Sequence, residues 1–158
     1  MIYLDNSATT RPFDSAIEAM AACMRETYFN PSSLYAPAMR AGEILAEARR
    51  EILSAVGGRG QVFFTSGGTE SNNLAIFGAQ RALRGRSGNF LTTKVEHPAV
   101  LETMAEVERL GCRVTYADVD AQGVVDVDAL VAAVDGETAL VSVMQVNNEV
   151  GAVQPIAE

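Results

Sequence analysis

The chain has 158 residues, with 20 acidic and 12 basic side chains and a formal net charge of −8. This length is typical of a single domain with its own core. An acidic chain without a basic run is not expected to bind nucleic acid. The N-terminus lacks the basic region and apolar segment of an export signal, and no apolar run approaches the ~20 residues that cross a bilayer. We therefore expect a cytoplasmic protein without a membrane or nucleic-acid partner.

The first part of the chain predicts two helices. Asp14 is a plausible N-cap for the first, and Pro31 interrupts the pattern after it. The second helix is expected to stop at Gly57 and Gly58, where a positive φ costs little. Both helices have an apolar face that we expect to point toward a core. The positions are Ile17, Met20, Ala21, Met24 and Tyr28 in the first helix and Ile44, Leu45, Ala48, Ile52 and Val56 in the second.

Short apolar or β-branched runs then alternate with helical patterns. The expected strands are residues 61–64, 90–93, 113–116 and 138–144, and the expected helices are about residues 70–83, 98–110 and 126–134. Partly continuous apolar character is typical of strands that are covered on both faces. Strands that alternate with helices at this spacing indicate crossover connections. The predicted fold class is α/β, with a mainly parallel sheet and helices on both of its faces.

The two cysteines, Cys23 and Cys112, belong to no CxxC pair, and neither stands beside a histidine. This spacing indicates neither a disulfide scaffold nor a metal site. We expect both residues to be small, buried and apolar, and we expect no metal ligands in the chain.

Polar clusters follow three of the expected strands. They are Thr-Ser-Gly-Gly-Thr at residues 65–69, Glu-His-Pro at 96–98 and Asn-Asn-Glu at 147–149. In an open parallel sheet, ligands bind beyond the carboxyl ends of the strands, where the loops into the next helices gather. The sequence therefore predicts that the three clusters share one rim.

The first cluster has the features of an anion site. Gly67 and Gly68 permit a tight turn and a close approach of the backbone to a ligand. The amides of the first helical turn, near Thr69 and Glu70, have no partners within the helix and can hold a phosphate together with the hydroxyls of Thr69 and Ser71. An ordinary turn that contains glycine is the alternative. The Walker and dinucleotide motifs are absent, so we do not expect a nucleotide.

His97 is the only histidine of the chain and stands at the expected start of a helix. A lone histidine is more often structural, but on this rim an imidazole can stack on a flat ring or move protons near neutral pH. Asn147 and Asn148 fit a turn equally well as they fit an amide donor to a ligand.

Five segments carry a family resemblance. They are residues 3–10, 30–33, 64–75, 96–97 and 147–151. Together they resemble the pyridoxal-phosphate-dependent cysteine desulfurases of the NifS/IscS type, in the class V aminotransferase family, over essentially the whole chain. The resemblance implies the aspartate-aminotransferase fold (PLP fold type I) and a homodimer. It also implies removal of sulfur from L-cysteine to leave L-alanine, with transfer through an enzyme persulfide to a sulfur acceptor or Fe–S scaffold protein, for iron–sulfur cluster or thio-cofactor assembly.

The resemblance assigns roles by position. It implies that Gly68 and Thr69 bind the phosphate of pyridoxal 5′-phosphate and that Asn148 donates to the phenolic oxygen of its ring. His97 would stack on the pyridine ring and act as a catalytic residue in proton transfer. Asn6 and Tyr35 stand where relatives often carry tyrosine and histidine, and a histidine often found before the double asparagine is also missing; these departures leave the class unchanged.

The groups for the covalent chemistry are not apparent in the sequence. Pyridoxal phosphate chemistry needs a lysine amine, and the only lysine, Lys94, stands at an ordinary strand-end position of the family. Cys23 and Cys112 match no nucleophile position. The resemblance places the catalytic lysine and cysteine after the point where this chain stops. We therefore expect an inactive N-terminal portion that binds the cofactor weakly or not at all.

Two domain segments follow from the resemblance. Residues 1–13 would lie near the pocket entrance, and residues 14–158 would be the first part of the large cofactor-binding domain. Two alternatives stay open at this point. One is another class V enzyme, such as a selenocysteine lyase, and the other is a non-catalytic binding module.

Overall fold

A computed structural model describes residues 2–157 of the chain. Its elements, in chain order, are α1 (Asp14–Glu26), α2 (Ala36–Ala55), α3 (Gly68–Ala82), β1 (Asn89–Thr93), α4 (Pro98–Arg109), β2 (Arg113–Ala117), α5 (Val127–Ala132) and β3 (Thr138–Ser142). The chain divides into two compact units, residues 1–64 and residues 65–158. None of the helices in residues 2–157 is long and apolar enough to cross a membrane.

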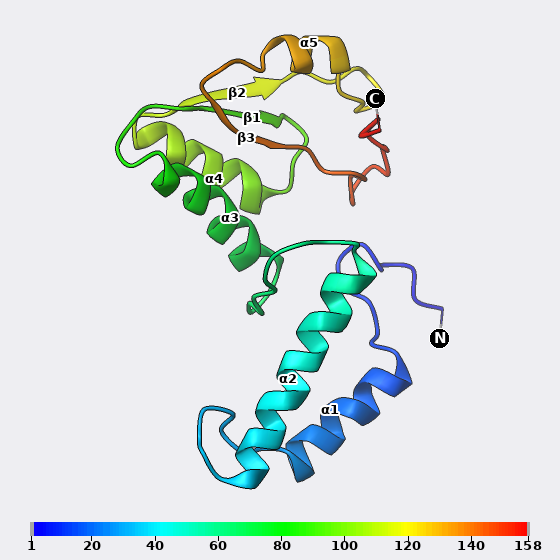
Figure 1. The fold of residues 1–158 in the computed structure, drawn as a ribbon. Helices are drawn as coiled ribbons and strands as arrows, with labels where there is room; N and C mark the ends of the chain where they lie inside the picture. Colours follow the sequence, from blue (N-terminus) through cyan, green and yellow to red (C-terminus); the bar gives the residue numbers. More distant parts are fainter. Residues whose placement is uncertain (1, 158) are drawn as a thin grey trace. The chain divides into compact units, whose positions relative to one another are not determined.

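The second unit is built on a parallel three-stranded sheet in the order β2-β1-β3. The central strand β1 is buried along its whole length, because it has a neighbour on each side and helices above and below. Figure 1 shows α3 and α4 on one face of the sheet and α5 on the other. The predicted α/β class, with a mainly parallel sheet and helices on both faces, is confirmed.

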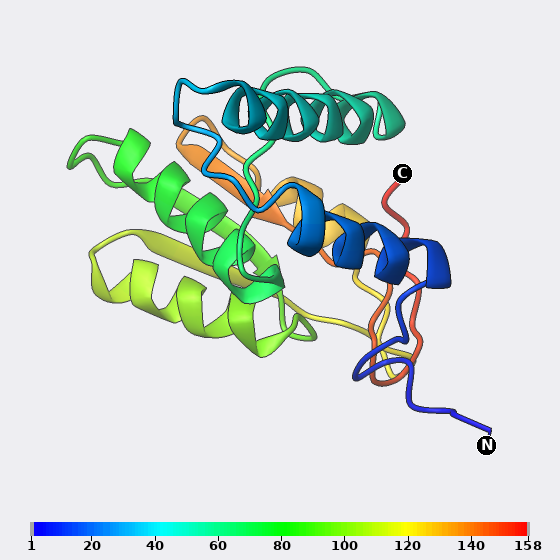
Figure 2. The same cartoon turned by 90° about the horizontal axis from the view of Figure 1, so that it is seen from below.

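A hydrophobic core joins the sheet to α3 and α4, which lie side by side in both views (Figures 1 and 2). Phe90 of β1 and Met104 of α4 are completely buried at its centre. Cys112 lies in the same core, so its expected burial is confirmed. This core fixes the ends of β1, α3 and α4, from which two of the three polar clusters project.

The prediction of a strand at residues 61–64 is wrong. These residues pair with no strand among those that the structure describes, and Phe63 and Phe64 are 71% and 51% exposed. The segment lies against α2 instead, where Arg49 Nε donates to the carbonyl of Val62 at 3.2 Å and the guanidinium lies 5.3 Å from the centre of the Phe64 ring. A strand needs a neighbour for its backbone hydrogen bonds, and apolar sequence alone does not supply one.

The expected burial of the first two helices is also wrong for most positions. No residue of α1 is buried, and α2 buries only Ala38 and Ala41. Met24 and the residue Tyr28 beyond the helix are more than 70% exposed, and Cys23 is exposed rather than buried. An apolar stripe is buried only where another layer covers it, and the described residues of the first unit do not form that layer.

Two helix ends differ in how well the sequence predicted them. Phe13 precedes α1 as its cap residue and makes no side-chain cap bond, so Asp14 is the first helical residue and forms an ion pair with Arg11. The glycine stop after α2 is confirmed: Gly57 has a φ of +60°, and the amide of Gly58 donates to the carbonyl of Leu53 at 2.9 Å.

Candidate functional site

The N-terminus of α3 presents free backbone donors. The amide of Ser71 makes the first bond of the helix, to the carbonyl of Gly67 at 3.1 Å. The amides of residues 68–70 donate to no group within residues 2–157. A Cβ placed on Gly67 or Gly68 would meet no atom within 4 Å, so a ligand can approach the backbone here. The hydroxyl of Thr69 has no partner among the described residues either.

Side chains around this turn hold its shape. Thr65 Oγ1 donates to the carbonyl of Gly67 at 3.1 Å and lies 2.6 Å from the hydroxyl of Ser71. The carboxylate of Glu70 accepts from the hydroxyl and the amide of Ser66, at 2.7 and 2.6 Å. These bonds lower the pKa of Glu70, the hydroxyl bond having the larger effect and the amide bond the smaller. The Ser71 hydroxyl is thus already engaged, whereas that of Thr69 is available.

His97 is fixed at the start of α4. Its Nδ1 accepts from the amide of Ala99 at 3.0 Å, which makes the imidazole the side-chain N-cap of the helix, and Pro98 follows in the first turn. Because Nδ1 is the acceptor, an imidazole that keeps this bond carries its proton on Nε2. The ring is therefore oriented by its own helix.

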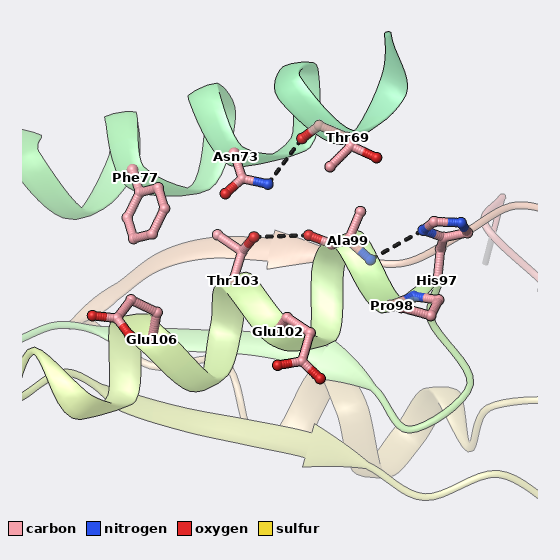
Figure 3. Close-up of a pocket in the computed structure, with 9 residues that line it drawn as sticks. All are labelled: Thr69, Asn73, Phe77, His97, Pro98, Ala99, Glu102, Thr103 and Glu106. Carbon is pink, nitrogen blue, oxygen red and sulfur yellow. Dashed lines mark hydrogen bonds between the residues drawn. The ribbon is translucent and has the colours of Figure 1, made fainter.

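A cleft of about 510 Å³ lies between α3 and α4 (Figure 3). Thr69 and His97 lie at the same end of it, where the two helices begin. Asn73 and Thr103 also line the cleft, but their side chains are bonded to backbone carbonyls, Asn73 Nδ2 to Thr69 at 2.9 Å and Thr103 Oγ1 to Ala99 at 2.7 Å. The free hydrogen-bond donors thus gather at the Thr69 end, while the carboxylates of Glu102 and Glu106 line the cleft further along α4.

A second, smaller cleft of about 300 Å³ adjoins the first, because His97 and Pro98 line both. Asn147 and Asn148 lie on its wall. The three polar clusters predicted from the sequence therefore surround one histidine.

The two asparagines differ in environment. Asn147 is 9% exposed, and its side-chain oxygen accepts from the amides of Glu149 and Val150 at 2.8 and 3.0 Å. Asn148 is exposed, and its side chain makes no hydrogen bond to the described residues. The sequence left both a turn and a ligand donor open for this pair. Asn147 forms the turn, and the amide of Asn148 is available.

Lys94 lines the smaller cleft, but its ammonium is paired with Asp118. Both side chains of the pair are more than half exposed. Cys112 lies in the hydrophobic core and is not part of either cleft. Within the second unit, the chain thus presents no free amine or thiol at the rim.

Sequence reasoning missed the role of two buried polar side chains near the site. Glu96 is 6% exposed and bonded to the segment after β3, and Gln154 is 3% exposed and links that segment to residues 123–125. A charged residue placed before the lone histidine is the only signal that the sequence offered for Glu96.

Comparison with known proteins gives a consistent family. The family model described as aminotransferase class-V matches residues 2–158. A NifS/IcsS protein homolog of Lactobacillus delbrueckii subsp. bulgaricus is 45% identical over 100% of this chain and 41% of its own length. A cysteine desulfurase IscS of Dictyoglomus turgidum is 43% identical over 99% of this chain and 40% of its own length. The chain spans about two fifths of the length of these curated relatives.

Solved structures give the same result. A structure described as a NifS-like protein superposes with a TM-score of 0.93 at 40% identity and covers 98% of this chain and 43% of its own. A structure described as SspA in complex with cysteine has a TM-score of 0.88 at 33% identity and covers 98% of this chain and 45% of its own. The fold is therefore that of the NifS-like proteins over the matched portion.

Proposed function

The chain belongs to the class V aminotransferase family, and we propose that it forms the N-terminal part of a pyridoxal-phosphate-dependent cysteine desulfurase. The proposed reaction converts L-cysteine to L-alanine and passes the sulfur on through an enzyme persulfide. Relatives named cysteine desulfurase IscS match 99% of the chain, which supports this activity. The structural observation that carries the proposal is that the free N-terminus of α3 and the oriented imidazole of His97 lie at one end of the same cleft.

The residues fit the phosphate of the cofactor. The free amides of residues 68–70 converge where the positive end of the α3 dipole also favours an anion. Thr69 adds a hydroxyl that has no competing partner among the described residues. Gly67 and Gly68 leave the approach to the backbone open. We therefore assign the phosphate to Gly68 and Thr69.

The residues also fit the ring of the cofactor. The imidazole of His97 is held at Nδ1 by Ala99, so its flat faces can stack and its Nε2 can hold or exchange a proton. Asn148 offers an amide donor to the phenolic oxygen from the adjoining cleft. When bound, pyridoxal phosphate supplies an electron sink for bond cleavage at the substrate. The part of this chain is to bind, orient and exchange a proton.

The amine and thiol of the reaction are assigned to residues outside this chain. The Lys94 ammonium is paired with Asp118, and Cys112 lies in the core. Cys23 is exposed but matches no nucleophile position of the family. We propose that the 158 residues hold the cofactor without supplying its covalent partner and are inactive alone. A homodimer, a sulfur acceptor or Fe–S scaffold protein and a cytoplasmic location belong to the same proposal. The structure described as SspA in complex with cysteine supports cysteine as the substrate.

Binding of the cofactor tests the proposal. Pyridoxal phosphate is titrated into the purified chain by absorbance, with inorganic phosphate as the competitor. We expect weak, reversible, phosphate-competitive binding. His97→Asn is the matched variant, because asparagine still caps α4 while the stacking ring is lost. It should lower the affinity for pyridoxal phosphate and leave the affinity for inorganic phosphate unchanged. Equal loss for both ligands would contradict the stacking role of His97.

Covalent trapping tests the second part. After reduction with borohydride in the presence of pyridoxal phosphate, peptide mapping should find no stoichiometric adduct on Lys94, and a desulfurase assay should show no turnover. A full adduct on Lys94 would show that this lysine is more than a surface residue. Turnover above background would show that the chain carries the complete catalytic machinery.

A further inference from the structure

We propose that Glu96 and Asn147 are positioning residues that hold the segment bearing Asn148 against the turn bearing His97. We call these two side chains and their bonds the Glu96–Asn147 clamp. The inference rests on the proposed function, because it concerns the spacing of the two groups assigned to the cofactor ring. It adds residues that touch no ligand and act through their neighbours.

Glu96 supplies the first link of the clamp. Its Oε1 accepts from the hydroxyl of Thr93 at 3.0 Å and from the backbone amide of Met144 at 2.7 Å, 48 residues further along the chain. Glu96 is only 6% exposed. Hydrogen bonds to a carboxylate are stronger than those between neutral groups, and loss of this acceptor would leave a partly buried amide unpaired.

Asn147 supplies the second link. Its Nδ2 donates to the carbonyl of Val95 at 2.9 Å, across 52 residues of sequence. Its Oδ1 accepts from the amides of Glu149 and Val150, and its backbone amide and carbonyl bond to Ala152 and Gly151 at 2.8 and 2.9 Å. All of its polar groups are therefore engaged. None remains for a ligand.

The two links flank the proposed ligand groups. Glu96 immediately precedes His97, and Asn147 immediately precedes Asn148. The imidazole is also fixed by the Ala99 amide, which donates to its Nδ1, whereas the side chain of Asn148 makes no hydrogen bond to the described residues. The position of the Asn148 amide relative to the imidazole therefore depends on the clamp. Such support from neighbouring side chains keeps a binding site in its productive geometry.

Packing gives this segment little other attachment. Val146 and Val150 are 51% and 71% exposed, so their apolar side chains hardly tie the segment to the core. Gln154 anchors the far side of the same turn, where its backbone amide donates to the carbonyl of Gln145 at 2.9 Å. The polar links of the clamp are consequently the main attachment of residues 146–150 to the His97 turn.

Amide hydrogen exchange of the 158-residue chain, followed by NMR, measures the first link directly. In Glu96→Leu the Met144 amide should exchange at least about tenfold faster, as expected for loss of a bond to a charged group. The Arg113 amide, which donates to Gly88 at 2.9 Å at the other end of the sheet, should change by less than about twofold. Glu96→Gln retains the acceptor oxygen and should preserve most of the protection.

Ligand binding then separates positioning from general stability. Glu96→Leu should weaken pyridoxal phosphate about tenfold or more while inorganic phosphate, held at α3, keeps its affinity. The single histidine gives one set of imidazole resonances, and these should shift more in Glu96→Leu than in Glu96→Gln. If Glu96→Leu fails to fold, Asn147→Asp, which replaces the donor to Val95 by an acceptor, tests the second link through the same two ligand affinities and the imidazole resonances.

Two results would overturn the proposal. One is an unchanged exchange rate of the Met144 amide in Glu96→Leu, and the other is an equal loss of affinity for pyridoxal phosphate and for inorganic phosphate in a folded variant. Failure of the proposed function gives a different result. In that case the unmodified chain binds neither ligand, while the exchange rates and imidazole resonances still decide whether the clamp exists.

Discussion

Replacing Thr69 by alanine should weaken the phosphate end of the site and leave the fold intact. Thr69 is exposed at the second position of α3, and its hydroxyl makes no hydrogen bond within residues 2–157. Its removal therefore breaks no contact that supports the helix. The backbone carbonyl of Thr69, which accepts from Asn73 at 2.9 Å, is unaffected by the substitution. Any change in ligand affinity thus comes from the lost hydroxyl.

The size of the effect follows from the kind of bond that is lost. A hydrogen bond to a charged group contributes about 1.5–3 kcal/mol, and this open site calls for the lower end. Since about 1.4 kcal/mol corresponds to a factor of ten in affinity, Thr69→Ala should raise the Kd for pyridoxal phosphate about tenfold. The three backbone amides of residues 68–70 remain, so binding should not be abolished.

Isothermal titration with pyridoxal phosphate and with inorganic phosphate checks this prediction. The affinities for both ligands should fall by the same factor, because we assign the hydroxyl to the phosphate group that they share. Thr69→Ser keeps the hydroxyl and serves as the matched control, with an affinity close to that of the unmodified chain. Normal binding by Thr69→Ala, or a loss confined to pyridoxal phosphate, would refute the assignment of Thr69 to the phosphate.

Three further predictions concern the second unit. Met104→Ala opens a cavity in the core and should lower the free energy of unfolding by about 2–5 kcal/mol in urea titrations. Met104→Leu keeps the volume and should lower it by less than about 1.5 kcal/mol. Similar losses for the two variants would argue against tight packing around Met104. The pKa of Glu70 in the folded chain is lowered below its usual value of 4.5. The stability that the ionised carboxylate contributes is therefore present above pH 4.5 and is lost as the pH falls through the folded pKa. The chemical shift of the Ser66 amide should titrate below pH 4.5, and this titration should be absent in Glu70→Gln. Lys94→Met removes an exposed pair with Asp118 and should change the unfolding free energy by less than about 1 kcal/mol, a larger loss being evidence for a structural role of the lysine.

The sheet and the helices of the second unit were predictable because their signals are local. The strands at β1, β2 and β3 are short apolar runs, and the helices between them have one apolar face each. The alternation of the two implies a parallel sheet, and a parallel sheet brings the carboxyl ends of its strands together. This geometry was enough to place His97 and Asn148 on one cleft without any contact being known. Thr69 lies near them because of α3, since the strand that we expected before it is not formed.

The failures occurred where burial depends on a partner. Phe63 and Phe64 have the composition of a strand, and Met20 and Met24 lie on an apolar helical face, yet all four are more than half exposed. Sequence shows that a segment is apolar and with what period. It does not show whether another layer lies opposite, which is what decides strand pairing and burial.

The division of work between Asn147 and Asn148 could not be predicted for a related reason. Both residues suit a turn, and both carry the same amide. Bonds to Val95, Glu149 and Val150 select Asn147 for the interior, and the bond to Val95 spans 52 residues. Glu96 is similar, because its partner Met144 lies in a different polar segment. Long-range hydrogen bonds of this kind leave no periodic signal.

The site combines two kinds of contact that respond differently to mutation. The proposed phosphate contacts are mainly backbone amides at the start of α3, which no side-chain substitution removes. The proposed ring contacts are the side chains of His97 and Asn148, and we propose that Glu96 and Asn147 set their spacing. The ratio of the affinities for pyridoxal phosphate and for inorganic phosphate therefore isolates the ring contacts. Substitutions that remove the ring contacts or the clamp bonds, such as His97→Asn and Glu96→Leu, should lower that ratio. Thr69→Ala should leave it constant, because it acts on a group that both ligands possess.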